Sequence, residues 1–130
     1  MISKTTENIK VDVRVRYVPE QSQPDRERFF FAYQVTLTNM RDESAQLLSR
    51  HWIITNGRGQ TEEVRGAGVI GEQPVLEPGA SFEYTSFCPL TTATGTMRGF
   101  YHWAGADGAP FSVEIPEFDL IQPEAMGLLH

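Results

Sequence analysis

Strict alternation of side chains with a period of two residues is the feature that most limits what this chain can fold into. Between residues 29 and 38, one face carries Phe29, Phe31, Tyr33, Val35 and Leu37, and the intervening residues form the other face. A period of two is that of a β-strand, whose successive side chains point to opposite sides of the sheet. This run predicts a long, central strand.

Further strands are expected in shorter runs that are separated by turn residues. Besides 29–38, we expect strands at residues 9–17, 47–55, 81–87, 96–104 and 111–115, and a short polar strand at 61–65 that leads into a glycine-rich loop. Turn signals lie between them at Asn56-Gly57, Pro78-Gly79 and Asp107-Gly108. No segment has helical periodicity of convincing length. Seven or eight short strands without helices predict an all-β fold, an antiparallel β-sandwich with immunoglobulin-like architecture.

The length of 130 residues fits one domain that spans residues 1–130. Two parts of it are expected to lie outside the sandwich. Residues 18–28 contain two prolines and nothing apolar between Val18 and Phe29, so they predict a mobile loop. Residues 119–130 predict a C-terminal tail.

Charge and composition exclude several classes of partner. The net charge is −6 and the 11 Lys and Arg residues are scattered, so no basic face is expected for nucleic acid. There is neither a signal-peptide core nor an apolar run long enough for a membrane span. Cys88 is the only cysteine, which excludes an internal disulfide and suits the cytoplasm. The charged outer face of the first expected strand, residues 9–17, predicts a monomer or a weak homodimer.

The segment Gly66-Ala67-Gly68-Val69-Ile70-Gly71 fits the G-x-G-x-x-G pattern of phosphate-binding turns. In a dinucleotide site a helix follows this turn, but here Pro74 and Pro78 prevent one. Two interpretations remain. The glycines can serve backbone geometry, through positive φ or close strand approach. Alternatively, their N–H groups can form an anion-binding nest.

The residues of such an anion-binding loop would be Arg65, Gly66, Gly68 and Gly71, with Arg58 as a second source of positive charge. Its ligand would be a small anion or a nucleotide, such as pyrophosphate or diadenosine tetraphosphate. Glu62, Glu63 and Glu72 flank the loop and oppose a polyphosphate.

Catalytic and metal-binding residues do not form a convincing set. In both His51-Trp52 and His102-Trp103 the histidine must point outward if the tryptophan fills the core, and no third ligand is apparent. Cys88 has no cationic neighbour in sequence to lower its pKa. We therefore expect no metal site, no cofactor, no catalytic residues and no enzymatic activity.

Several motifs together resemble the ApaG family of bacterial proteins, whose domain also recurs in some eukaryotic F-box proteins and in a polymerase-interacting protein. These motifs are Arg50-His51-Trp52, residues 66–74, the Pro78-Gly79 turn with Tyr84-Thr85-Ser86, and Met97-x-Gly99-x-Tyr101. The resemblance implies a fibronectin type III-like sandwich and an association with cobalt resistance and magnesium efflux. It brings no catalytic residues.

Two functions remain at this point. The first is an interaction module that offers a sheet face or an edge strand to another protein. The alternative is the anion- or nucleotide-binding loop at Gly66 to Gly71.

Overall fold

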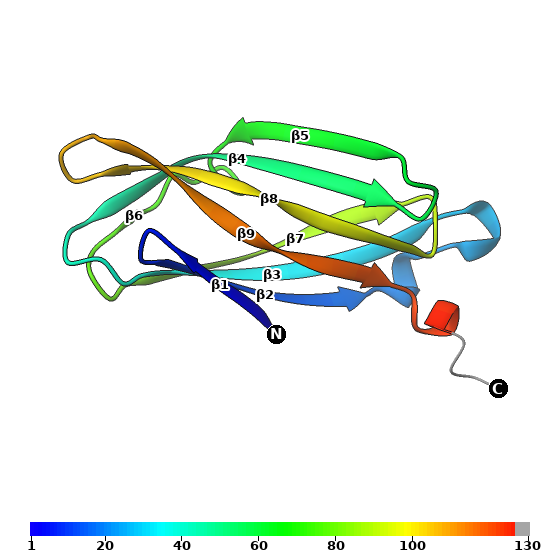
Figure 1. Ribbon diagram of the computed structural model, residues 1–130. Coiled ribbons are helices and arrows are strands. Elements are labelled where there is room, and N and C mark those ends of the chain that lie inside the picture. The colour runs from blue at the N-terminus through cyan, green and yellow to red at the C-terminus, as the bar shows by residue number, and fades with distance from the viewer. Residues whose placement is uncertain (127–130) are drawn as a thin grey trace.

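The computed structural model describes residues 1–126 and shows two antiparallel sheets packed face to face (Figure 1). The first sheet has the order β1 (Ile2–Thr6), β2 (Ile9–Tyr17), β3 (Phe29–Asn39) and β7 (Ser81–Leu90). The second has the order β5 (Thr61–Ala67), β4 (Ala45–Asn56), β8 (Thr94–Gly105) and β9 (Pro110–Ile121), with β6 (Val75–Leu76) also paired to β4. The predicted all-β antiparallel sandwich is confirmed.

Strand β3 lies in the middle of the first sheet, as its alternation predicts. Its odd-numbered side chains are buried against the second sheet, and it pairs with β2 on one side and β7 on the other. In the second sheet, Trp52, Tyr101 and Trp103 point inward in the expected phase and are almost completely buried. Burial of these aromatic rings is the main apolar contribution that a sandwich of this size can gain.

Strand β1 was not expected, because its sequence, ISKTT, has no apolar alternation. It joins β2 through Glu7 and Asn8, which both have positive φ, as a tight hairpin turn requires. Strand β2 is therefore not the edge of its sheet. Lys4 of β1 forms an ion pair with Glu114 of β9 at 2.8 Å, so the two sheets close against each other on this side.

The loop expected at residues 18–28 contains two short 3₁₀ turns, η1 (Pro19–Gln21) and η2 (Pro24–Arg26). Its base is attached to the first sheet, because Val18 is buried and Ser22 bonds across the loop. The Ser22 hydroxyl accepts the Phe30 N–H and donates to the Val18 carbonyl.

Two strands are longer than their sequences predict. Strand β7 includes Cys88, Pro89 and Leu90, which lie beyond the strand predicted at residues 81–87. Strand β9 continues past Pro116 to Ile121, because an irregularity in its pairing with β8 absorbs the proline.

The predicted start of the C-terminal tail at residue 119 is therefore wrong, because β9 continues to Ile121. Leu120 is completely buried in the core, and the 3₁₀ turn η3 (Pro123–Met126) follows β9. Residues 127–130 of the expected tail lie outside the described residues. Within residues 1–126, no helix has the length and apolar character that a membrane crossing requires.

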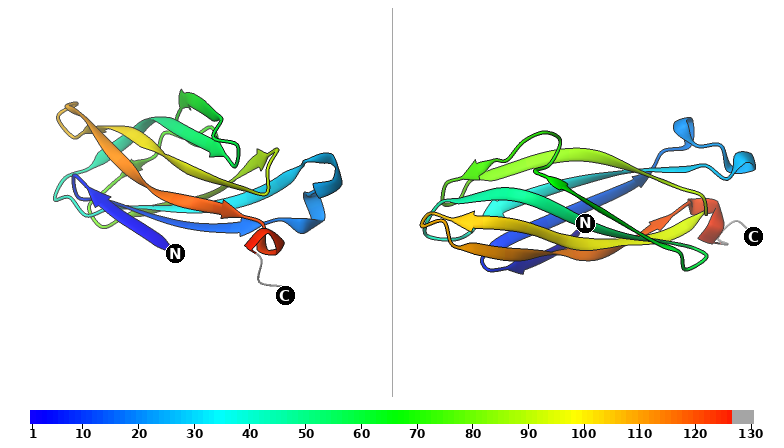
Figure 2. Two further views of the ribbon diagram at one scale, coloured as in Figure 1. Left: turned by 45° about the vertical axis from the view of Figure 1, so that its right-hand side comes forward. Right: turned by 90° about the horizontal axis from the view of Figure 1, so that it is seen from above.

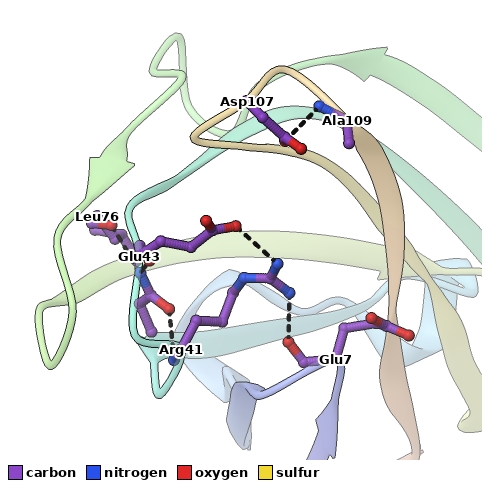
Figure 3. A network of polar contacts seen from close by, with 7 residues as sticks. Glu7, Arg41, Glu43, Leu76, Asp107 and Ala109 are labelled. Carbon is purple, nitrogen blue, oxygen red and sulfur yellow. Dashed lines mark hydrogen bonds and ion pairs between the residues drawn. The ribbon is translucent and has the colours of Figure 1, made fainter.

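One end of the sandwich is held by Asn39 and Arg41 (Figure 3). The buried Asn39 amide donates to the Glu43 and Leu76 carbonyls, at 2.9 and 2.8 Å, and its oxygen accepts the Arg41 N–H. The Arg41 guanidinium donates to the Glu7 carbonyl at 3.0 Å and to the Glu43 carboxylate at 3.2 Å. These bonds join loops from both sheets.

The two long sides of the sandwich differ. Strands β1 and β2 run beside β9 along one side, while β7 forms the opposite side (Figure 2, right). On that opposite side the edge strands are β7 in the first sheet and β5 in the second. No ladder hydrogen bonds join β5 to β7, so the sandwich is open there.

Candidate functional site

The glycine segment begins at the end of β5 and forms a tight turn. Gly68, Ile70 and Gly71 have positive φ, and Val69 and Glu72 exchange backbone hydrogen bonds of 2.9 and 2.8 Å. Positive φ at Ile70 and Gly71 is the conformation of a type I′ turn. This turn reverses the chain and buries Val69 in the core. The interpretation that these glycines serve backbone geometry holds for Gly68 and Gly71.

Most polar groups of the expected anion-binding loop already have partners in the protein. The Gly68 N–H donates to the Leu48 carbonyl at 2.8 Å. Arg65 pairs with Glu63 at 3.2 Å, and Arg58 pairs with Glu27 at 3.4 Å. The four predicted residues, Arg65, Gly66, Gly68 and Gly71, thus lie on one segment, but the side chain of Arg65 is turned toward a carboxylate.

Arg50 is the residue that sequence reasoning missed. Its guanidinium lies over Gly66, and Nη1 donates to the carbonyls of Ala67 and Gly68, both at 3.0 Å. Gly66 has ordinary φ, so its lack of a side chain serves close approach rather than turn geometry. The sequence did contain a signal for the role of Arg50. Arg50 lies in phase with Trp52 and Ile54, so it places a charge on the inward face of β4.

A cleft of about 320 Å³ opens beside Arg50, between β5 and β7. Tyr33, Trp52, Ile54 and Met97 form its inner part, and its rim combines Glu62 and Val64 of β5 with residues 86–89 of β7. At the Glu62 end, a second hollow of about 290 Å³ continues between residues 54–62 and residues 89–91.

Tyr33 and Cys88 at the cleft, and Tyr84 and Tyr101 in the core, are held in their neutral forms. Burial raises the pKa of Tyr33, of Tyr84 and of Tyr101, and the last two hydroxyls are bonded to each other. Burial, with a smaller contribution from the Glu62 carboxylate, raises the pKa of the Cys88 thiol to about 12. Cys88 is therefore a protonated core thiol at neutral pH, as expected, and a poor nucleophile.

Both histidines outside the C-terminal segment point away from the core, as predicted from the inward tryptophans. His51 lies 2.7 Å from the Glu63 carboxylate, and His102 lies 3.0 Å from the Ser112 hydroxyl. The hydrogen bond from His51, together with Arg65, lowers the pKa of Glu63. Within residues 1–126, no three His, Cys, Asp or Glu side chains gather as a metal site would require.

The fold and this cleft define a class: a small antiparallel β-sandwich of the fibronectin type, open along one side. The model of the ApaG domain matches residues 19–105. Protein ApaG of Bordetella pertussis is 54% identical over 119 residues, which cover 92% of this chain and 91% of the relative. The chain belongs to the ApaG family, as the sequence motifs indicated.

Two further comparisons agree with this assignment. Protein ApaG of Pseudomonas paraeruginosa is 54% identical over 125 residues, which cover 96% of this chain and 99% of the relative. A crystal structure of a Bordetella pertussis protein superposes with a TM-score of 0.87 at 56% identity, covering 88% of this chain and 94% of that one. The likeness thus extends over nearly the whole described sandwich.

Proposed function

We propose that this protein is a non-enzymatic interaction module that binds another protein in the cleft between β5 and β7. The observation that carries the proposal is the open side of the sandwich, where an apolar side chain is exposed at the rim of the cleft. Val64 of β5 is 37% exposed at this rim. The edge strand β7 carries Phe87, which is 51% exposed on the outer face of the first sheet and stacks on Phe30. Apolar groups that are left exposed beside a concave surface are typical of docking sites.

The chemistry of the cleft supports binding rather than catalysis. The Tyr33 hydroxyl and the Cys88 thiol are buried and neutral, and Arg50 is bonded to two backbone carbonyls. A general acid or base needs a pKa near the working pH. The pKa of Tyr33 and that of Cys88 are instead displaced away from neutrality.

The association of the family with cobalt resistance and magnesium efflux fits this proposal, in which the bound protein carries the effect on metal ions. On the outer face of the second sheet, His51 is hydrogen-bonded to Glu63 and His102 to Ser112. We place the module in the cytoplasm, as a monomer or weak homodimer, without a cofactor and without a nucleic-acid or membrane partner.

Site-specific photo-cross-linking tests the docking surface. A photoreactive residue at Val64, on the rim of the cleft, should give a reproducible adduct with one protein in the native cytosol. The matched control is Ile2, an exposed aliphatic residue on β1 at the opposite side of the sandwich. Equal adducts from both positions, or none from Val64, would contradict the proposal.

A second candidate is binding of a small anion by the glycine turn. It is favoured by the N–H groups of Ile70 and Gly71, which have no acceptor within residues 1–126. Successive donors of this kind can form an anion nest. If the turn binds anions, pyrophosphate, ATP or diadenosine tetraphosphate should raise the melting temperature of the protein, because a ligand of the folded state stabilises it. We expect no rise at sub-millimolar ligand, since Glu72 adjoins these donors.

A further inference from the structure

We propose that the partner supplies an extended segment that adds as a strand to the free edge of β7, antiparallel to it. Its inward side chains are, in order, a cation, an apolar residue and a carboxylate at alternate positions, facing Glu62, Val64 and Arg50. This inference rests on the proposed function and gives its binding mode and ligand chemistry.

The hydrogen bonds of β3 show which backbone groups of β7 are free. The Phe30 N–H and carbonyl bond to Ser22 and Val18, away from β7, whereas the Asn39 N–H bonds to Ala80 on the β7 side. Odd residues of β3 therefore pair with the even residues of β7, through an unbroken register. The odd residues of β7, from 81 to 89, direct their backbone groups to the free edge. Pro89 lies among them, so its missing N–H costs no bond to β3 and leaves the free edge with the donors of residues 81 to 87.

The part of β7 that borders the cleft lacks the charges that protect other edges. Residues 84–90, YTSFCPL, include no charged side chain, and Glu83, the one charged residue of β7, is bonded to Gln34 and Thr36 of β3. By contrast, β5 has Glu62, Glu63 and Arg65 within seven residues, and β1 is covered by the ion pair between Lys4 and Glu114. Natural sheets usually protect an edge with charges, and an uncharged edge with free N–H and carbonyl groups accepts another strand.

A strand added to β7 extends the first sheet, so its inward side chains enter the cleft and face β5. Along β5, Glu62, Val64 and Gly66 are successive inward positions, and Arg50 occupies the space over Gly66. Alternate residues of the added strand repeat at about 6.8 Å, the same spacing. Nη2 and Nε of Arg50 have no protein acceptor within residues 1–126, so a carboxylate can bind there.

The order of charges along β7 sets the order of residues in an antiparallel segment. Arg50 and Ile54 of β4 pair with Gly66 and Glu62 of β5, and β4 and β7 run in the same direction (Figure 1). Glu62 also lines a hollow with Pro89 and Leu90 at the end of β7. The chain direction of β7 thus runs from the Arg50 end to the Glu62 end. An antiparallel segment meets Glu62 first and Arg50 last, which predicts the order cation, apolar residue, carboxylate.

A second copy of this chain is the competing occupant of the edge. Pairing of two β7 strands would bring only the inward, even-numbered side chains of β7 into the cleft, and none of these is charged. Glu62 and Arg50 would then have no countercharge from the incoming strand. The charges of the cleft therefore favour a different protein.

The test uses a fluorescent peptide, Thr-Lys-Thr-Val-Thr-Glu-Thr, and the reversed peptide with the same composition. Fluorescence anisotropy should show that the full chain binds the first peptide at least about tenfold more tightly than the reversed one. Glu62→Lys should weaken binding of the first peptide about tenfold and restore it for a peptide with Glu in place of Lys. Equal affinity for both peptide directions would overturn the proposal.

The edge itself is tested with Thr85→Pro, which removes a free-edge N–H, and with Thr85→Ala as the matched control that keeps it. We expect loss of peptide binding in the first and parent-like binding in the second. If Thr85→Pro does not fold, peptides N-methylated at the Thr positions or at the Lys, Val and Glu positions replace it. One of these two methylated peptides should lose binding and the other should keep it, because only alternate residues of the added strand form hydrogen bonds with β7.

The outcomes separate the two proposals. If Val64 cross-links to a protein but neither peptide direction is preferred, docking stands and strand addition fails. If Val64 gives no adduct, docking itself fails. If the parent dimerises and Thr85→Pro is monomeric, the edge belongs to a second copy of the chain, and the proposed segment is wrong.

Discussion

The guanidinium of Arg50 occupies the space that a side chain at position 66 would need. A β-carbon on Gly66 would lie 2.9 Å from both Nη1 and Nη2 of Arg50. The same guanidinium holds the carbonyls of Ala67 and Gly68, so it connects β4 to the glycine turn. The first glycine of the motif thus leaves room for the guanidinium of an arginine 16 residues earlier in the sequence.

Substitutions at the other two glycines of the motif should differ in cost. A β-carbon on Gly68 would lie 2.2 Å from the Glu72 carbonyl oxygen, whereas one on Gly71 would meet nothing within 4 Å. We expect Gly68→Ala to lower the free energy of unfolding by about 2–4 kcal/mol, through both the clash and the positive φ. Gly71→Ala should lower it by about 1–2 kcal/mol, from φ alone. Urea unfolding measures both, and equal losses would contradict the clash.

Replacement of Trp52 by alanine should lower the free energy of unfolding by about 3–5 kcal/mol. The ring packs against Tyr33, Phe118 and Tyr101, with centroid distances of 5.2, 6.0 and 6.3 Å. Phe87→Ala on the exposed face is the control and should cost about 1 kcal/mol or less. Thermal and urea unfolding measure both variants. If Trp52→Ala unfolds like the parent, Trp52 does not pack in the core as these distances indicate.

Asn39→Ala should cost about 2–4 kcal/mol, because it leaves one buried carbonyl, one partly buried carbonyl and one N–H without partners. The carbonyls belong to Glu43 and Leu76, and the N–H to Arg41. Gln34→Ala removes an exposed bond to Glu83 and serves as the control, with a cost of about 0.5 kcal/mol or less. Similar urea midpoints for the two variants would contradict the assigned role of Asn39.

Stability should fall at alkaline pH because burial raises the pKa of Tyr33, Tyr84 and Tyr101. Above the ordinary tyrosine pKa of about 10, the unfolded chain loses these protons while the folded chain keeps them. The stabilisation is complete below that pH and is lost as the pH rises toward the folded-state values. Absorbance at 295 nm should therefore show these tyrosines ionising only as the protein unfolds. Their titration near pH 10 in a folded protein would contradict this.

The Cys88 thiol should be unreactive in the folded protein. Its pKa is raised to about 12 by burial, so almost no thiolate is present at pH 8. A disulfide reagent added at that pH should label the thiol in urea but not in buffer. Rapid labelling in buffer, with the far-UV spectrum unchanged, would show that the cleft exposes Cys88.

Much of the sandwich follows from the sequence alone. Alternation identified the seven principal strands and the inward phase of Trp52, Tyr101 and Trp103, because apolar side chains on one face of a strand must be buried. Pro78-Gly79 predicted a type II turn, which the positive φ of Gly79 and the bond from Ala80 to Glu77 fit. These features depend on residues that are close in the chain.

Other features depend on contacts between distant residues. The polar strand β1 forms because β2 provides its ladder bonds, and β9 passes Pro116 because Phe118 and Leu120 gain burial in the core. The spacing of glycines predicted a turn but could not show that Arg50 lies over Gly66. The sequence by itself determined the seven principal strands and the faces that they bury, since local patterns of apolar and polar residues are enough for that. Only the tertiary structure decided which edges stay open and which charges line the cleft, because both depend on the sheet order that brings β5 opposite β7.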